Sequence, residues 1–531
     1  MSPSMYPDYP PDLDAEQQKF LLQNVEDWSI AHGLAVRPAA TWVSEQQDPA
    51  GALATTAPVT MFPSLFPKGC FDQAKLVAKS YNELYSAIAS NESWLKEIVE
   101  ELVEIDEFMA ELWKVHLAVK KEGYAQVGLI FWKIHDTKLT RNQPLNLGLF
   151  RSDYMVHVDA SGSKPKATVK QVEFNTIASS FGGLSSQVSA MHRHLSSIDA
   201  YPESTSSLIK STTLPQSTSV PELARGMAVA HDAYGKSSAG LPTCVIFLVQ
   251  DPERNVFDQR HLEYALNSTH GVKTFRLTFA RVLADTEVDA SRKLIYSPPH
   301  APTKKFEVSL VYFRAGYAPS EYRGKQDWDA RLHIERSAAI KCPSILTHLA
   351  GTKKVQQVLA TPHSPHLKHF VPDEARAAEV LKTFAPIYPL DKSEAGQEAR
   401  KLATHPESAA RYVLKPQREG GGNNVYRNAI PDFLKTLPES HWPAYILMEM
   451  IEPPAQSNII FRNGEMQKGG VICELGIYGA CLWRSGETDG EREVLENFEA
   501  GYLLRTKGSG SEEGGVAAGF GSVDSACLVD F

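Results

Sequence analysis

Apolar and polar positions divide the chain into an early helical part, a middle part that alternates strands with helices, and a late β-rich part. Apolar residues at helical spacing follow Asp14 and predict a helix over residues 14–32 with Asp14 as its N-cap. Residues 72–121 are acid-rich and predict a long helical stretch. The side chains expected to form its buried stripe are Leu76, Tyr81, Leu84, Ile88, Leu95, Ile98, Leu102 and Phe108.

The middle of the chain predicts a parallel sheet. Two apolar, β-rich runs at 243–250 and 273–280 enclose a helical segment at 256–268. This order indicates parallel strands, because a parallel pair needs a long crossover connection that is usually a helix. A third strand is expected at 308–313, which gives a module over residues 241–350.

Polar loops follow the first and third of these strands, at 251–255 (DPERN) and 314–317 (RAGY). Both loops are expected at the carboxyl ends of parallel strands, which is the edge where open α/β sheets bind ligands. The two loops are therefore candidate binding loops.

A glycine-rich stretch, 415–424 (KPQREGGGNN), follows a short apolar strand at 411–414. Three adjacent glycines allow backbone angles closed to other residues. Backbone N–H groups and Lys415 suit a phosphate, and Glu419 with its neighbouring amides suits a hard cation such as Mg²⁺. A solvated turn is the alternative interpretation.

A second candidate site lies at the end of the strand predicted over 169–175. Because side chains alternate on a strand, Gln171, Glu173 and Asn175 are expected on one face, and Val172 and Phe174 on the core side. A carboxylate and an amide followed by residues 176–183 (TIASSFGG) fit a site for Mg²⁺ and an anion. An exposed polar strand end explains the same residues.

Three further side chains are single candidates. Arg151 interrupts β-structure predicted over 145–158, and it suits either a substrate carboxylate or a surface ion pair. Lys353 is expected near a helix N-terminus, where it can meet a phosphate. Glu474 lies in a strand pair expected at 470–478, and a carboxylate among apolar neighbours needs a partner.

Composition narrows the class of protein. The 531 residues favour several domains, and the net charge of −9 with mixed signs gives no basic footprint for nucleic acid. No apolar run is long enough to cross a membrane, and the first residues lack the pattern of a signal peptide. Six scattered cysteines without a Cys-x-x-Cys pair fit reduced thiols in a cytoplasmic protein.

Seven separated motifs resemble the eukaryotic glutathione synthetase family and occur in the family's order. They lie at 173–184 (EFNTIASSFGGL), 349–357 (LAGTKKVQQ), 414–424 (LKPQREGGGNN), 448–453 (MEMIEP), 474–477 (ELGI), 504–507 (LRTK) and 514–519 (GGVAAG). Any one of them is weak alone, but their succession from near the start to near the end of the chain is specific.

The resemblance implies an α/β ATP-grasp fold with an inserted parallel-sheet, substrate-binding domain and a Gly-rich lid. The expected division is 1–240 for an N-terminal helical and ATP-grasp portion, 241–350 for the inserted domain, and 351–531 for a C-terminal ATP-grasp portion with a lid at 385–442. The family is dimeric, so a homodimer is expected.

The resemblance also implies an activity: ATP-dependent joining of γ-glutamylcysteine to glycine through an acyl phosphate, with release of ADP and phosphate. The implied catalytic residues are Arg505, Lys415 and Glu419, and the implied Mg²⁺ ligands are Glu173, Asn175 and Glu419. The residues implied to bind ATP are Glu173, Lys353, Lys415, Pro416, Gln417, Arg418, Glu419, Gly420, Gly421, Gly422, Asn423, Asn424, Tyr426, Met448, Glu449, Met450, Ile451, Glu474 and Lys507.

The residues implied to hold γ-glutamylcysteine and glycine form a second set. They are Arg151, Ile177, Ala178, Ser179, Ser180, Glu253, Arg254, Asn255, Gln259, Arg314, Ala315, Gly316, Tyr317, Arg505, Val516 and Ala517.

Two positions depart from the family pattern. Glu513 stands where the family has Asp, and Ala315 replaces the Asp of the family's Arg-Asp-Gly-Tyr motif. Two other functions are considered: a homoglutathione-type ligase that uses β-alanine, and a non-catalytic ATP-grasp binding protein. Residues 516–518 (VAA) favour glycine, because relatives that prefer β-alanine carry bulkier residues there.

Overall fold

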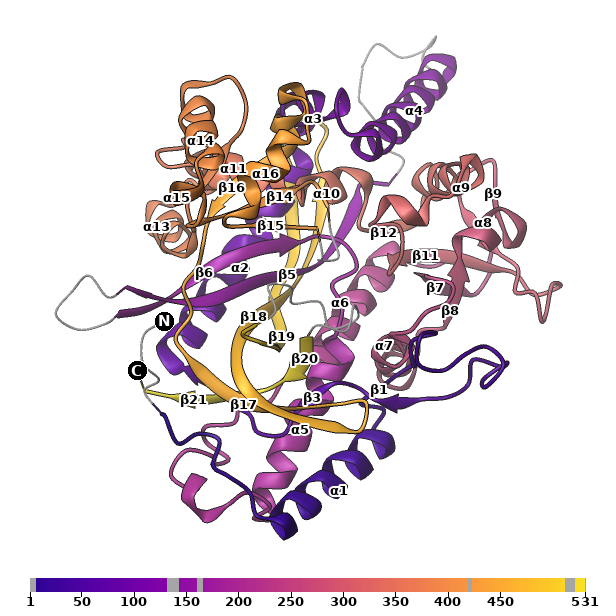
Figure 1. The fold of residues 1–531 in the computed structure, drawn as a ribbon. Coiled ribbons are helices and arrows are strands. Elements are labelled where there is room, and N and C mark those ends of the chain that lie inside the picture. Colours follow the sequence, from indigo (N-terminus) through magenta and orange to yellow (C-terminus); the bar gives the residue numbers. More distant parts are fainter. Residues whose placement is uncertain (1–5, 131–142, 160–165, 419–422, 511–520, 531) are drawn as a thin grey trace.

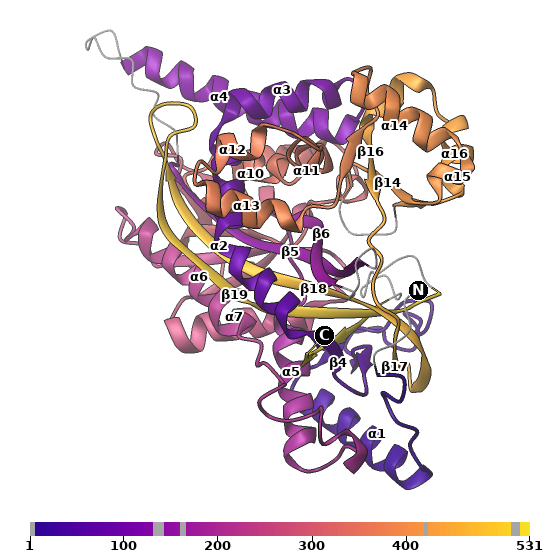
Figure 2. The same ribbon diagram turned by 90° about the vertical axis from the view of Figure 1, so that its left-hand side faces the viewer.

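The computed structural model describes residues 6–130, 143–159, 166–418, 423–510 and 521–530, with backbone alone at 123–130. The protein is a mixed α/β molecule with several sheets (Figure 1). The parallel sheet lies to one side of a large central sheet, and a small four-stranded sheet lies at the opposite end from the first helix (Figure 2).

Seven strands form the central sheet in the order β17-β3-β20-β19-β18-β5-β6, and β17 also pairs with β18. All pairs are antiparallel except β20 with β3. The bounds are β3 Val59–Thr60, β5 Leu145–Asp159, β6 Lys166–Asn175, β17 Gln456–Arg462, β18 Glu465–Ser485, β19 Arg492–Gly508 and β20 Gly521–Asp524.

Two expectations for these strands are wrong. No break interrupts β5 at 151–154, because that segment pairs with β18 and β6 throughout. Residues 470–478 are not a strand pair but the middle of β18, which is one long strand.

Helices cover both faces of the central sheet. On one face α2 (Lys68–Ser90) packs against Phe174 of β6, whose ring stacks on Tyr85 at a centroid distance of 3.8 Å. On the other face, α5 (Gly182–Ser197) and α6 (Ser219–Tyr234) bury Leu184 and Met227 against the opposite side of β18. The prediction that Phe174 enters the core is confirmed.

The single long helix expected at 72–121 is three helices, namely α2, α3 (Glu92–Val103) and α4 (Glu107–Ile130). Asn91 caps α3 and Asp106 caps the start of α4, since their side chains accept backbone N–H groups. Most of the expected stripe is buried, but Leu76 is 67% exposed, so its assignment to the core is wrong.

The predicted parallel sheet is confirmed and is larger than expected. Its order is β8-β7-β11-β10-β9 with β12 beside β11, and β7, β8, β11 and β12 run parallel. The bounds are β7 Thr243–Val249, β8 Thr274–Thr278, β9 Thr286–Val288, β10 Leu294–Tyr296, β11 Phe306–Phe313, β12 Ile340–Cys342, α7 Val256–His270, α8 Phe279–Asp285 and α9 Lys325–Glu335.

The four-stranded sheet has the order β13-β16-β14-β15 and its own apolar cluster, which includes Leu390, Leu414 and Trp442. Its elements are β13 Ile387–Pro389, α14 Glu394–Thr404, α15 Pro406–Ala409, β14 Tyr412–Pro416, β15 Val425–Tyr426, α16 Ala429–Lys435, a 3₁₀ turn Glu439–Ala444 and β16 Tyr445–Glu449.

The remaining elements connect these units. They are α1 Ala15–Ala31, β1 Ala35–Val36, β2 Thr55–Thr56, β4 Ser64–Pro67, 3₁₀ turns Glu203–Thr205 and Pro319–Glu321, α10 Ile345–Ala350, α11 Lys353–Ala360, α12 His366–Phe370, α13 Glu374–Thr383 and β21 Ala526–Val529. Asp14 caps α1 as predicted.

Candidate active site

Neighbouring strands β6, β5, β18 and β19 present charged side chains on one face of the central sheet. Arg151 and Asp153 are two residues apart on β5 and therefore share a face. In the ladders Asp153 lies opposite Glu173 of β6, and Glu474 of β18 lies opposite Arg505 of β19. Arg505 and Asp153 make contact although 352 positions separate them in the sequence.

Asp153 is the centre of this charged cluster and is fully buried. Its Oδ1 accepts Nε of Arg151 at 2.6 Å, and its Oδ2 accepts Arg151 Nη2 at 2.8 Å, Arg505 Nη2 at 2.9 Å and Asn175 Nδ2 at 3.0 Å. Arg505 also donates to Glu474. Burial disfavours the charge on Arg151, but Asp153 outweighs it and raises the pKa of Arg151.

Glu173 faces two lysines. Lys353, the first residue of α11, places Nζ 3.0 Å from Oε2 of Glu173. Burial raises the pKa of Glu173, but Lys353, Lys415 and Arg505 together outweigh burial and hold that pKa well below its usual range. Glu173 is therefore an ionised carboxylate at neutral pH.

The prediction that Gln171 shares a face with Glu173 and Asn175 is wrong. The β5–β6 ladder pairs Asp153 with Glu173 but Tyr154 with Gln171, so one residue of β6 is left over. Such a bulge slips the register by one residue and turns the following side chains to the opposite face. Gln171 therefore lies on the core side of the sheet.

Val172 is the residue left out of the ladder. Its carbonyl oxygen accepts Lys415 Nζ at 2.9 Å and Gln356 Nε2 at 3.3 Å. On the core side, Gln171 donates to Ser152 Oγ at 2.8 Å. The bulge thus supplies a backbone acceptor that brings Lys415 beside Glu173.

Ser180, between β6 and α5, joins the charged cluster to the parallel sheet. Its carbonyl accepts Arg151 Nη1 at 3.1 Å and the Tyr478 hydroxyl at 2.5 Å, and its Oγ accepts Arg314 Nη2 at 2.8 Å. The preceding members of the predicted substrate set, Ile177, Ala178 and Ser179, form the start of this connection.

Asp258, in the first turn of α7, holds the N-terminus of α5. Its carboxylate accepts the N–H of Phe181 at 2.9 Å and of Gly183 at 2.7 Å, which is the favourable position for an anion on a helix. It also pairs with Arg314 at 3.1 Å and accepts Asn255 Nδ2 at 3.2 Å. This buried carboxylate therefore holds Arg314 beside Ser180.

The loops that follow β7 and β11 meet, as their places at one sheet edge predict. Gln250 Nε2 donates to the Tyr317 hydroxyl at 3.0 Å. In the loop that follows β11, Ala315 is buried and Gly316 has a φ of +87°. A Cβ at position 316 would lie 2.8 Å from the Phe279 ring. Glycine is therefore needed at 316.

Glu253, Asn255 and Gln259 form one hydrogen-bonded group. Glu253 accepts the Asn255 N–H at 2.8 Å and Gln259 Nε2 at 2.6 Å. Arg254 is exposed and donates to the carbonyl of Arg37 at 3.4 Å, so its side chain is directed to the N-terminal segment.

The described members of the predicted nucleotide-binding set lie on or beside the four-stranded sheet, on α11, and on β6, β18 and β19 of the central sheet. Gln417 accepts the N–H of Lys354 at 2.9 Å, and Arg418 pairs with Asp106 at the start of α4. These contacts join the end of β14 to α11 and to the helical part.

Strand β16 lies between β13 and β14, and its residue Met448 pairs with both neighbouring strands. The Met448 side chain is buried. Glu449 accepts the Tyr388 hydroxyl at 2.8 Å, and Asn424 donates to the Tyr426 hydroxyl at 3.2 Å. The other described members of the predicted set are Pro416, Asn423, Met450, Ile451 and Lys507. Outside the described residues lie Glu419, Gly420, Gly421, Gly422, Glu513, Val516 and Ala517.

Among the residues that the structure describes, no three His, Cys, Asp or Glu side chains gather as a metal site. Glu173 and Asn175 are nevertheless both oxygen donors on one face of β6. Asn175 commits its amide nitrogen to Asp153 at 3.0 Å and to the Arg151 carbonyl at 3.3 Å, which turns its oxygen the other way. An ionised carboxylate and an amide oxygen fit the ligand preference of Mg²⁺.

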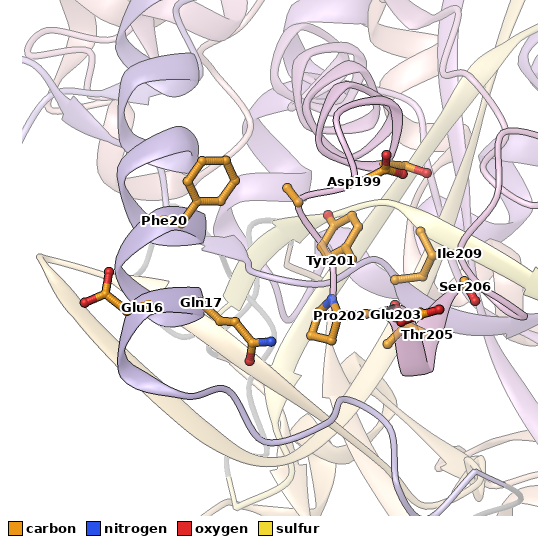
Figure 3. A pocket seen from close by; sticks show the side chains of 12 residues that line it. Glu16, Gln17, Phe20, Asp199, Tyr201, Pro202, Glu203, Thr205, Ser206 and Ile209 are labelled. Carbon is orange, nitrogen blue, oxygen red and sulfur yellow. Dashed lines mark hydrogen bonds between the residues drawn. The ribbon is translucent and has the colours of Figure 1, made fainter.

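A separate pocket of about 610 Å³ lies between the start of α1 and the segment after α5 (Figure 3). Three acids, Glu16, Asp199 and Glu203, and the rings of Phe20 and Tyr201 are part of its lining. None of its lining residues belongs to the charged cluster or to the predicted site.

The family model described as "Eukaryotic glutathione synthase, ATP binding domain" matches residues 15–528. The chain belongs to the eukaryotic glutathione synthase family. Glutathione synthetase large chain of Schizosaccharomyces pombe is 39% identical over 96% of this chain and 97% of its own length. Human glutathione synthetase is 37% identical over the same shares.

A solved structure has the same fold at lower identity. The apo form of a glutathione synthetase-like effector from Globodera pallida aligns with a TM-score of 0.69 over 98% of this chain and 99% of its own. Because the identity is 20%, this likeness concerns the fold alone. Among the helices that the structure of this chain describes, none is long and apolar enough to span a membrane.

Three functional candidates, Asp153, Tyr478 and Asp258, were not predicted from the sequence. The signal for Asp153 was present, because it stands two residues after Arg151 on a predicted strand and so shares its face. Tyr478 and Asp258 reach Ser180 and α5 from distant segments, and no local pattern announces such contacts.

Proposed function

We propose that this chain is a glutathione synthetase that joins γ-glutamylcysteine to glycine and converts ATP to ADP and phosphate. The observation that carries the proposal is the relatedness to curated glutathione synthetases over nearly the whole chain, at 37–39% identity. The charged cluster on β5, β6, β18 and β19 supports it, since its cations suit a nucleotide phosphate and a carboxylate.

The proposed reaction activates a carboxylate, whose own leaving group would be oxide. The γ-phosphoryl of ATP passes to a carboxylate oxygen at the cysteinyl end of the dipeptide, and ADP is released. The glycine amine then attacks the acyl carbon and loses a proton, and phosphate leaves with the former carboxylate oxygen. This chemistry requires positioning and neutralisation of charge, without an enzyme nucleophile.

Arg505, Lys415 and Glu419 are proposed to act on the reacting groups. Arg505 donates to Asp153 at the centre of the charged cluster and Lys415 lies beside Glu173, so two cations face one region. A preorganised cation stabilises charge as it develops and needs no rearrangement during the reaction. Arg505 is proposed to lie near the glycine end of the site.

Glu173, Asn175 and Glu419 are proposed to hold Mg²⁺. The bound ion would supply positive charge that neutralises the transferring phosphoryl group. The fit rests on the ionised state of Glu173 and on the oxygen that Asn175 presents.

The remaining residues are proposed to bind ATP and the dipeptide as the family resemblance implies. Lys353, Gln417, Met448 to Ile451, Glu474 and Lys507 would hold ATP between the four-stranded and central sheets in an ATP-grasp fold. The residues proposed to hold γ-glutamylcysteine are Arg151, Ser180, Asn255, Gln259, Arg314 and Tyr317. The contacts of Arg151 and Arg314 with Ser180, and of Asn255 with Asp258, support this set.

Organisation beyond the site is proposed on the same basis. Residues 1–240 and 351–531 would form the ATP-grasp portions, 241–350 the substrate-binding domain and 385–442 a lid. We also propose a homodimer and a cytoplasmic location. The cytoplasmic location is supported by the six cysteines, which are all buried and form no disulfide.

The test is acceptor-dependent turnover. Purified protein with ATP and Mg²⁺ is given γ-glutamylcysteine, glycine or both, with ADP measured by a coupled assay and the product by mass spectrometry. ADP and glutathione should form together only when both substrates are present. ATP binding without ADP release would indicate a non-catalytic binding protein and contradict the proposal.

The same assay separates the two acceptors. Equal concentrations of glycine and β-alanine are offered together, and the ratio of the two tripeptides is measured. Glutathione should dominate, and an excess of the β-alanine product would replace the proposed acceptor.

A further inference from the structure

We propose that Asp153 is a positioning residue, a buried carboxylate that sets the orientation of Arg151, Arg505 and the Asn175 amide. The inference rests on the proposed function. Asp153 has no role in any of the residue sets that the family resemblance implies. Its assignment comes from the contacts of its two carboxylate oxygens.

Both oxygens of Asp153 are fully used by groups of the site. Arg151 binds both of them, through Nε at 2.6 Å and Nη2 at 2.8 Å, and this two-point contact fixes the plane of the guanidinium. Oδ2 also accepts Arg505 Nη2 at 2.9 Å. One carboxylate therefore fixes two cations that come from strands β5 and β19.

Burial makes this arrangement costly as a purely structural device. The Asp153 side chain is 0% exposed, and those of Arg151 and Arg505 are 5% and 16% exposed. Removing charged groups from water often costs as much as their pairing returns, so a buried pair contributes little net stability. An orienting role explains why the charges are retained here.

The third contact concerns the proposed metal site. Asn175 donates Nδ2 to Asp153 Oδ2 at 3.0 Å and to the Arg151 carbonyl at 3.3 Å. A carboxylate accepts hydrogen bonds and cannot donate one, so Asp153 selects the amide orientation in which the oxygen of Asn175 points away. That oxygen is the atom that Mg²⁺ would bind.

Gly476 gives independent support from the neighbouring strand. It lies opposite Asp153 in the β5–β18 ladder. A Cβ at this position would lie 2.7 Å from Arg151 Cδ and 2.8 Å from Asp153 Oδ1. Glycine at 476 therefore leaves the space in which the Arg151–Asp153 pair lies.

The first test replaces Asp153 with asparagine. Asp153→Asn keeps the size of the side chain but lets an amide N–H face the two arginines and the Asn175 amide. Binding of γ-glutamylcysteine, measured by isothermal titration calorimetry without nucleotide or metal, should weaken by about 10–100-fold, which is typical when an orienting partner is lost. The Mg²⁺ concentration that half-saturates ADP binding should rise over a similar range.

A second variant leaves the carboxylate in place. Gly476→Ala should weaken γ-glutamylcysteine binding in the same direction, because the added Cβ displaces the Arg151–Asp153 pair. This variant keeps the inference testable if Asp153→Asn does not fold.

The matched control is Glu307→Gln. Glu307, on β11 of the parallel sheet, is another fully buried carboxylate. It accepts the hydroxyls of Tyr234 and Ser237 and forms an ion pair with Lys293. This variant should lower the melting temperature and leave both binding constants unchanged, which separates positioning from general destabilisation.

The outcomes distinguish this inference from the proposed function. If the unaltered protein binds γ-glutamylcysteine and folded Asp153→Asn and Gly476→Ala bind it and Mg²⁺ equally well, the positioning role is overturned. If the unaltered protein itself neither binds the dipeptide nor forms glutathione, the proposed function fails instead.

Discussion

Glu173 shows how burial and charge compete at a single side chain. Burial alone would favour a protonated carboxyl, but Lys353, Lys415 and Arg505 hold its pKa well below the usual range. Glu173 therefore stays ionised through the neutral pH range. The strand pattern predicted Glu173 as a candidate site residue, whereas the cations around it come from three distant segments, and only the family resemblance placed them in the same site.

Glu173→Gln removes the negative charge and keeps the shape of the side chain. The variant cannot offset the charge of Lys353 or hold a divalent cation well, so ADP release should fall by about 10²–10³-fold. Turnover is measured at saturating substrates, with the circular dichroism spectrum as the control for folding. Turnover close to that of the unaltered protein would exclude Glu173 from the metal and nucleotide site.

Arg505 lies between Asp153 and Glu474 and is proposed near the glycine end of the site. Arg505→Ala should raise the KM for glycine by about 10–100-fold, by analogy with the loss of other charge-assisted contacts, and should raise the KM for ATP far less. Initial rates are measured with each substrate varied in turn. Equal changes in the two KM values would argue against this placement.

Strands and helices show where local sequence rules succeed. The alternation around β7, β8 and β11 predicted a parallel sheet, and the structure confirms it. The rules failed at α2–α4, because the apolar spacing continues across the breaks and only the caps Asn91 and Asp106 mark them. Both caps are residue types that favour helix starts, and they are the local signal of the breaks.

The bulge in β6 is the failure with the largest consequence. Strict alternation placed Gln171 in the site, whereas one unpaired residue, Val172, turned it to the core side. A bulge depends on the partner strand, so the sequence of β6 alone does not reveal it. The carbonyl exposed by the bulge is the one that accepts Lys415.

Asp524 joins three strands of the central sheet. Its carboxylate accepts the hydroxyls of Thr60 on β3 and Thr506 on β19, both at 2.6 Å, and the N–H of Ser525 at 2.7 Å. Burial raises the pKa of Asp524 to about 6 in spite of these hydrogen bonds. The folded protein therefore retains this proton at a pH where the unfolded chain has lost it.

This difference makes stability depend on pH. Between about pH 4 and pH 6 the folded state binds one more proton at Asp524, so its contribution to the free energy of unfolding falls as pH rises, by about 3 kcal/mol in total. Asp524→Asn cannot titrate and loses this dependence. Urea denaturation at several pH values should show the variant gaining relative to the unaltered protein up to about pH 6. A constant difference would contradict the raised pKa.

At the scale of the whole molecule, the site depends on contacts between units that are distant in sequence. Lys415 on the four-stranded sheet reaches β6 across 243 positions, and Arg418 reaches Asp106 across 312. Arg314 on the parallel sheet reaches Ser180 across 134. Local patterns predicted the parallel sheet, but only the resemblance to a family placed segments so distant in sequence in one site, because local periodicity contains no information about such contacts.

The central claim is that these units together transfer a phosphoryl group to the dipeptide carboxylate and then replace it with glycine. Its most direct test uses γ-glutamylcysteine labelled with ¹⁸O in the cysteinyl carboxyl group, with unlabelled ATP, Mg²⁺ and glycine. Mass spectrometry of the released phosphate should find one ¹⁸O atom for each glutathione formed, because phosphate leaves with the former carboxylate oxygen. Phosphate without label, formed together with glutathione, would contradict the acyl phosphate route.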